Sequence, residues 1–120
     1  MKIAVTSTGK TLQSDIDPRF GRAQYFIIVD PETLVFDVVE NTQNLNLPQG
    51  AGIQAGKAIV DNKAEVVITG NCGPKAFQVL SAAGVKVVVG AGGRVIDGIQ
   101  KYKNGELKPA DGANVDGHWA

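Results

Sequence analysis

The alternation of strand-like and helix-like segments constrains the fold of this chain more than any other feature of its sequence. Short apolar runs typical of β-strands occur at residues 2–7, 23–30, 34–41, 66–68 and 85–89. The first three follow one another directly, whereas a segment with the apolar spacing of a helix precedes each of the last two and another follows them. We therefore predict an α/β fold with the element order β-β-β-α-β-α-β-α.

Capping residues mark the three predicted helices. The first has apolar residues at helical spacing over residues 51–59, after a polar loop. Pro74 suits the first position of the second helix and Gly84 its end, because the first turn needs no proline N–H and glycine tolerates a left-handed cap. The third helix begins after Gly92-Gly93 and stops at Asn104-Gly105.

The connections predict a mixed sheet. The strands at 23–30 and 34–41 are separated only by Pro31-Glu32-Thr33, which suits a hairpin. Strands linked through a helix must run parallel, and right-handed crossovers place them side by side. We expect a five-stranded sheet in which the first, fourth and fifth strands are parallel and the hairpin is an antiparallel flank. Asp37 indicates a solvated face and an edge position for the third strand.

Length and composition fit one globular domain. The chain has 120 residues, of which 43% are hydrophobic, which is enough for a single core. We expect that domain to span residues 1–107. The remaining residues have no apolar period, so 108–120 are predicted to form a mobile tail.

The balance of charge excludes several classes of partner. Twelve Lys and Arg residues offset twelve Asp and Glu residues, so no broad basic surface is available for nucleic acid or an acidic membrane. Met1-Lys2 leads directly into a strand rather than a leader peptide, and no apolar run approaches the length of a membrane span. We expect a cytoplasmic monomer.

Cys72 is the only thiol. It cannot form an intramolecular disulfide, and no second cysteine or nearby histidine completes a zinc cage. The predicted topology puts Cys72 near the start of the second helix, a position that lowers a thiol pKa and suits a soft metal. A small buried residue in a strand-to-helix turn is the alternative.

Three loops are expected at the carboxyl edge of the parallel strands, where open α/β sheets bind ligands: residues 7–10, 70–73 and 90–93. The last two precede helices whose unpaired N–H groups and positive dipole ends favour an anion. The same glycines would also serve simply to make tight turns. We predict backbone donors to one anion pocket from four residues: Asn71, Gly73, Gly92 and Gly93.

The loop after the first strand carries unusual charge. It reads SDIDPRFGRAQYFIIVD over residues 14–30 and must return along the same sheet edge. Arg19 and Arg22 are predicted to reach the pocket as fixed positive charges, with Gly21 permitting the turn and Phe20 either anchoring the loop or walling the site. An arginine–aspartate network that only holds the loop is the alternative.

Catalytic motifs are weak. GIQAGKA at residues 52–58 looks like a phosphate-binding loop but is one residue short and lacks the hydroxyl that binds magnesium. The first strand has no carboxylate, which opposes two-metal nuclease chemistry. Cys72 has no plausible base for nucleophilic catalysis. We therefore expect a protein that is not an enzyme.

The sequence DPRFGRA at residues 17–23, followed by Tyr25-Phe26 and a strand, resembles the signature of the dinitrogenase iron–molybdenum cofactor biosynthesis family. The likeness extends from Met1 to about Leu107 and includes the closing KNGEL at residues 103–107. The family comprises small NifX/NifB-like proteins, so the resemblance implies a ribonuclease H-like fold. The chain is most similar to the orange protein branch, whose members carry a molybdenum–copper sulfide cluster without a cysteine cage.

The resemblance implies a non-catalytic carrier or assembly protein for an anionic metal–sulfur cluster, acting with protein partners. The cargo would be a molybdenum–copper sulfide cluster or a precursor of the iron–molybdenum cofactor, held largely without covalent bonds. The predicted cluster-binding residues, with Cys72 as an optional metal ligand, are Arg19, Phe20, Gly21, Arg22, Asn71, Cys72, Gly73, Gly92 and Gly93.

Histidine usage departs from the family pattern. Family members often carry histidine at the position of Arg19, and also in the loop at residues 43–49 or in the tail, whereas this chain has only His118, beside Trp119. The departure favours electrostatic and hydrogen-bonded holding of a cluster. The alternative function is a small anion- or nucleotide-sensing regulatory module that acts through a protein partner.

Overall fold

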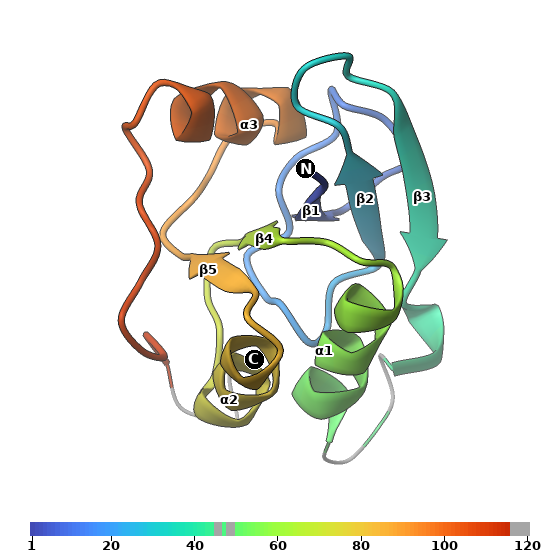
Figure 1. Ribbon diagram of the computed structural model, residues 1–120. Helices are drawn as coiled ribbons and strands as arrows, with labels where there is room; N and C mark the ends of the chain where they lie inside the picture. Colours follow the sequence, from blue (N-terminus) through green and yellow to red (C-terminus); the bar gives the residue numbers. More distant parts are fainter. Residues whose placement is uncertain (45–46, 48–49, 116–120) are drawn as a thin grey trace.

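The computed structural model describes residues 1–44, 47 and 50–115, which form a five-stranded sheet with helices on both faces (Figure 1). Its strand order is β3-β2-β1-β4-β5. The strands are β1 (Ile3–Ser7), β2 (Tyr25–Val29), β3 (Phe36–Glu40), β4 (Val66–Ile68) and β5 (Lys86–Val88). The predicted α/β class and five-stranded sheet are confirmed.

Strand directions follow the connections. β1, β4 and β5 are parallel, while β2 pairs antiparallel with both β1 and β3. Ile3 of β1 lies opposite Val29 on one side and Val66 on the other. The mixed sheet, the hairpin flank and the edge position of β3 are thus as predicted.

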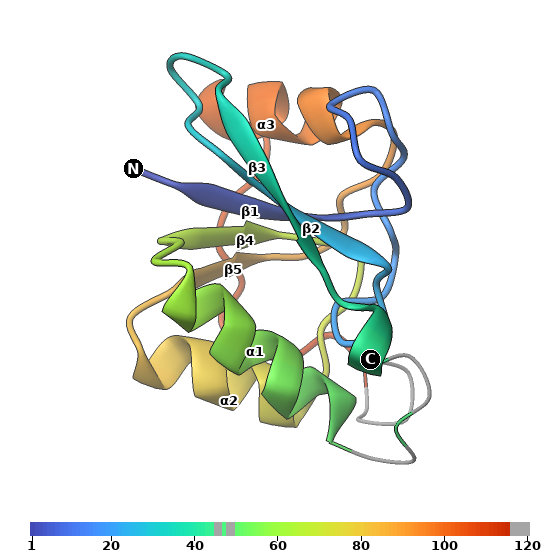
Figure 2. The same cartoon turned by 90° about the vertical axis from the view of Figure 1, so that its right-hand side faces the viewer.

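Side chains alternate between two cores along the strands. Ala4 and Val67 belong to the core that α1 and α2 cover, whereas Ile3 and Val5 belong to the core that α3 covers. Figure 2 shows α1 and α2 together on one face of the sheet and α3 on the other. All five residues of β1 are buried, including the polar Thr6 and Ser7 at its carboxyl end, so both faces of this strand are covered.

The three helices begin and end close to their predicted limits. They are α1 (Ala51–Asp61), α2 (Pro74–Ala82) and α3 (Val95–Lys103), and the short 3-10 helix η1 (Thr42–Asn44) precedes α1. Gly84 follows α2 with a φ of 78°, the left-handed conformation that ends many helices. No helix within the described ranges is long and apolar enough to cross a bilayer.

The glycines of the GIQAGKA sequence lie inside α1 and face α2. A Cβ atom on Gly52 would lie 3.1 Å from the Ala76 Cβ atom, and one on Gly56 would lie 3.0 Å from a methyl group of Val79. These glycines therefore allow α1 and α2 to pack closely. Their position within a helix argues against a phosphate-binding loop, which must lie between a strand and a helix.

The turn between β2 and β3 is longer than predicted because Asp30 organises it. Its Oδ1 atom accepts hydrogen bonds from the Glu32 N–H at 2.8 Å and the Thr33 N–H at 3.3 Å. Leu34 has a φ of 62°, which is left-handed and incompatible with a strand. The third strand therefore begins at Phe36 rather than at Leu34.

Residues 108–115 return along β5 instead of extending from the domain. The Ala110 N–H donates to the Val87 carbonyl oxygen at 2.7 Å, and the Asn114 N–H donates to the Cys72 carbonyl oxygen at 3.2 Å. These hydrogen bonds attach residues 110 and 114 to the domain, and the mobility of the tail stays a prediction. The domain boundary at residue 107 stays a prediction, and His118 and Trp119 lie outside the described residues.

The substitution Gly56→Leu should destabilise the protein by separating α1 from α2. Leucine favours a helix more than glycine does, but its side chain would overlap Val79, and such overpacking typically costs about 1–3 kcal/mol. Urea unfolding measures the change. The control Lys57→Leu adds the same side chain at an exposed position of α1 and should change the free energy of unfolding by less than about 0.5 kcal/mol. Equal stability of both variants would show that the helices do not depend on this contact.

Candidate functional site

The loops that follow β4 and β5 are joined at the carboxyl edge of the sheet. The Thr69 N–H donates to the Val88 carbonyl oxygen at 3.0 Å, and the Gly90 N–H donates to the Gly70 carbonyl oxygen at 2.8 Å. The parallel arrangement of these strands brings their ends together, as predicted. Hydrogen bonds therefore join the first residues of the two loops at this edge of the sheet.

The loop after β1 crosses this edge and is held to β1 through Asp17. The Thr6 hydroxyl donates to the Asp17 carbonyl oxygen at 2.7 Å, and the Asp17 N–H donates to the Thr6 carbonyl oxygen at 2.9 Å. The Asp17 side chain is only 5% exposed, and its Oδ1 atom accepts the Arg19 N–H at 3.1 Å. This carboxylate therefore shapes the turn that presents Arg19.

Two apolar side chains anchor the same loop, one on each face of the sheet. Ile16 is buried in the core beneath α3, and Phe20 is fully buried in the core beneath α1 and α2. The Phe20 ring centroid lies 5.6 Å from that of Phe26. Of the two roles predicted for Phe20, the structure therefore supports the anchor and not the wall of a site.

The loop makes direct contact with the loop after β4. The Phe20 N–H donates to the Asn71 carbonyl oxygen at 3.1 Å, and the Asn71 side-chain amide donates to the Pro18 carbonyl oxygen at 3.0 Å. A Cβ atom on Gly70 would lie 2.8 Å from the Pro18 Cα atom, so only glycine permits this approach. These contacts place Arg19 and Asn71 side by side as an isolated parallel β-bridge of the backbone.

The arginines and Gly21 lie around this contact. Arg19 is exposed, Arg22 is half-buried, and Gly21 is buried with its carbonyl oxygen 3.1 Å from the Asn41 side-chain amide that donates to it. Within the described ranges Arg19 forms no ion pair, since the Asp17 carboxylate is used by the backbone. For Arg19, the predicted alternative of an arginine–aspartate network is therefore not observed.

Cys72 lies in the core beneath α1 and α2 and is fully buried. Its Sγ atom is 3.7 Å from the Gly73 carbonyl oxygen, to which it donates. Burial raises the pKa of this thiol from its ordinary 9.0 to about 12. The predicted lowering of the pKa at this position is wrong, because burial disfavours the charged thiolate.

The donor set opposes a conventional metal cage. Among the described residues, no group of three or more His, Cys, Asp or Glu side chains could hold a metal ion. A thiol that keeps its proton to a high pH is also a poor ligand, because metals bind the thiolate. This edge can therefore offer an anionic cluster the N–H donors of arginine side chains and amides, and not a cage of metal ligands.

Gly92 and Gly93 lie at the start of α3, where the helix donors are already in use. The Val95 N–H donates to the Ser14 carbonyl oxygen and the Ile96 N–H to the Leu12 carbonyl oxygen, both at 2.9 Å. Backbone carbonyls of the loop after β1 thus use two N–H groups of this helix end, and donation to an anion by Gly92 and Gly93 stays a prediction.

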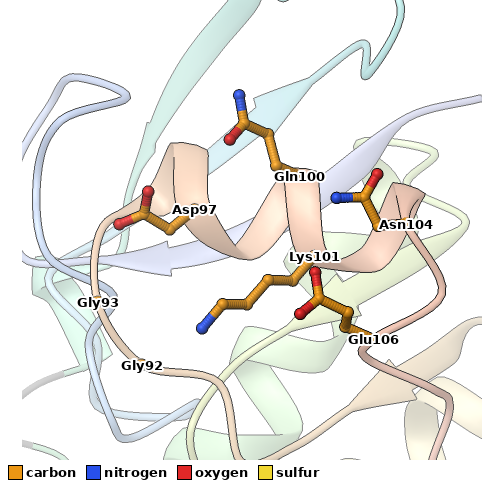
Figure 3. A pocket seen from close by; sticks show the side chains of 7 residues that line it. All are labelled: Gly92, Gly93, Asp97, Gln100, Lys101, Asn104 and Glu106. Atoms are coloured by element: carbon orange, nitrogen blue, oxygen red, sulfur yellow. The ribbon is translucent and has the colours of Figure 1, made fainter.

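The two glycines line a pocket of about 370 Å³ along α3 (Figure 3). Its other lining residues are Asp97, Gln100, Lys101, Asn104 and Glu106. None of the predicted residues between Arg19 and Gly73 contributes to this pocket. A single anion pocket shared by all the predicted residues therefore stays a prediction.

Asn114 is a residue of this edge that the sequence does not single out. Its Oδ1 atom accepts the Cys72 N–H at 2.8 Å, and its side-chain amide donates to the Gly70 carbonyl oxygen at 3.2 Å and to the Asn71 Oδ1 atom at 3.0 Å. Gly73 is buried beside it and precedes α2, its carbonyl oxygen accepting the Phe77 N–H at 3.0 Å. No periodicity or motif in the sequence marks Asn114.

The model of the family described as "Dinitrogenase iron-molybdenum cofactor" matches residues 1–105. The chain belongs to this family. The match covers every strand and helix and both loops that meet at Asn71, so the family assignment rests on the whole fold.

Solved structures of the same fold include close relatives. The apo form of the orange protein from Desulfovibrio gigas is 41% identical, with a TM-score of 0.93 over 95% of this chain and 96% of that one. A Thermotoga protein provisionally described as NifB is 40% identical, with a TM-score of 0.78 over 90% of this chain and 91% of that one. By sequence alone, an uncharacterized protein from Methanocaldococcus jannaschii is also similar, with 29% identity over 111 residues, 90% of each chain. The family resemblance seen in the sequence is thus confirmed, whereas the ribonuclease H-like label stays a prediction.

Replacing Cys72 with alanine should make stability less dependent on pH in alkaline solution. The folded pKa of about 12 exceeds the ordinary 9.0, so the unfolded chain loses its proton first as the pH rises. Stability present below pH 9 is therefore lost between about pH 9 and 12. Between about pH 8 and 10 the wild type should lose roughly 1 kcal/mol more than Cys72→Ala, measured by urea unfolding at both pH values. Equal losses would indicate that the thiol ionises normally in the folded protein.

Proposed function

We propose that this protein binds and carries an anionic molybdenum-containing metal–sulfur cluster as a non-catalytic carrier or assembly protein. The observation that carries the proposal is the contact between the DPRFGR loop and the loop after β4, which presents Arg19 beside Asn71 at the carboxyl edge. Family membership supports the class of cargo. The cluster is a molybdenum–copper sulfide, as in the orange protein branch, or a precursor of the iron–molybdenum cofactor.

The chemistry of the edge suits a sulfide-rich anion. Sulfur atoms of such a cluster are weakly hydrated acceptors, and guanidinium N–H groups are weakly hydrated donors that lose little on contact. Asn71 adds a carboxamide, and α2 begins next to it at Pro74, where the helix dipole is positive. A neutral chain with a local pair of arginines would hold a small anion without attracting nucleic acid.

Elemental analysis by mass spectrometry and a visible absorbance spectrum test the function. The protein is purified from its native host without a metal-affinity tag. Molybdenum and sulfide at near-stoichiometric amounts, with or without copper or iron, are expected together with visible absorption bands. A colourless, metal-free protein that also fails to take up tetrathiomolybdate and copper would contradict the carrier function and favour the regulatory anion- or nucleotide-sensing module.

The substitutions Arg19→Ala and Arg22→Ala should weaken cluster retention at raised salt. Each removes a charged donor, and a charged hydrogen bond contributes about 1.5–3 kcal/mol, so the retained molybdenum should be lost roughly tenfold more readily. The measurement is molybdenum remaining after gel filtration at increasing salt, with thermal unfolding to check the fold. Lys86→Ala, an exposed charge at the opposite end of β5, is the control. Retention equal to that of the wild type would remove the arginine from the site.

A further inference from the structure

The segment at residues 108–115, here called the strap, crosses from the end of α3 to the loop after β4. Figure 1 shows it in orange to red, passing β5 on its way toward α2. The Ala110 N–H is bonded to β5 through the Val87 carbonyl oxygen at 2.7 Å, and the Asn114 N–H is bonded to the Cys72 carbonyl oxygen at 3.2 Å. The strap therefore ends on the loop that adjoins Arg19.

Asn114 satisfies polar groups of the loop after β4, which adjoins Arg19. Its Oδ1 atom accepts a hydrogen bond from the Cys72 N–H at 2.8 Å. Cys72 immediately precedes Gly73, the N-cap residue of α2. Its amide group is bonded to the Gly70 carbonyl oxygen and the Asn71 Oδ1 atom. A carboxamide oxygen thus occupies the position that an acceptor atom of a bound anion would take on the Cys72 N–H.

Polar contacts rather than apolar burial hold the strap. All of its residues are exposed except Ala110 and Val115, which are half-buried. The DPRFGR loop, in contrast, has Ile16 and Phe20 in the two cores. Segments with few buried apolar contacts open at low free energy, so the strap can detach while the loop stays in place.

The strap does not pack tightly against α2. A pocket of about 610 Å³ lies between them, lined on the α2 side by Phe77, Gln78 and Ser81 and on the strap side by Asp111, Gly112 and Ala113. Interiors that hold an element permanently are close-packed. This pocket indicates that the strap lies on the surface of α2 without being built into the core.

We propose that the strap is a displaceable cover of the anion site, in which Asn114 competes internally for the Cys72 N–H and is released when the anionic cargo binds. The inference rests on the proposed function, because the competitor is the cargo itself. An internal competitor reduces the apparent affinity to the intrinsic affinity multiplied by the fraction of molecules in which the cover is open. The strap therefore sets how tightly the cargo is held and when it is released.

Titration with tetrathiomolybdate, followed by its visible absorbance, tests the competition. Asn114→Ala should bind the anion about fivefold more tightly than the wild type, because the competing hydrogen bond to the Cys72 N–H and the two that hold the side chain in place are removed. Asn62→Ala, the same substitution between the end of α1 and the start of β4, at the opposite edge of the sheet, is the matched control and should bind as the wild type does. Equal or weaker binding by Asn114→Ala would overturn the inference. Failure of every variant to bind would contradict the proposed function instead.

Amide hydrogen exchange of the ligand-free wild type tests the cover without any anion. The N–H groups of Ala110, Asn114 and Cys72 should exchange at similar rates, at least 100-fold faster than core amides such as that of Val67, because opening of the strap exposes them together. Exchange of these three groups as slow as in β4 would show that the strap does not open. That result would overturn the inference even if tetrathiomolybdate binds.

Discussion

The burial of β1 on both faces is the constraint on which the rest of the structure depends. Ala4 points into one core and Ile3 and Val5 into the other, so helices must cover both sides of the sheet. Neither face of β1 is open to a ligand. The loops at the carboxyl edge are the places where polar side chains of distant segments meet, which explains why the candidate site lies at the strand ends.

At that edge, permanent and exchangeable contacts stand side by side. Ile16 and Phe20 fasten the DPRFGR loop into both cores, so Arg19 is presented from a backbone that is already ordered. An ordered site loses less conformational entropy when a ligand binds. The strap reaches the same loop after β4 through Asn114, with hydrogen bonds and little apolar burial. The proposed carrier function requires both properties, because a carrier must recognise its cargo and also release it.

The buried thiol changes the chemistry expected of this family member. Cys72 is the residue that a soft metal would prefer, yet burial raises its pKa to about 12 and places it in the core. Its backbone N–H, rather than its sulfur, takes part in the contacts at the edge. The proposed recognition of an anionic cluster therefore relies on N–H donors and charge rather than on a cage of metal ligands.

The sequence by itself determined the element order, the direction of each strand and the family, because these depend on local periodicity, on Pro74 and Gly84 at helix ends, and on connection length. It also located the two loops that meet at Asn71. Only the tertiary structure decided that Cys72 is buried, that the start of α3 is filled by backbone carbonyls, and that Asn114 lies on the loop after β4. Each of these depends on contacts between residues far apart in the chain. Such contacts carry no local signal, since they form only when the assembled cores bring the segments together.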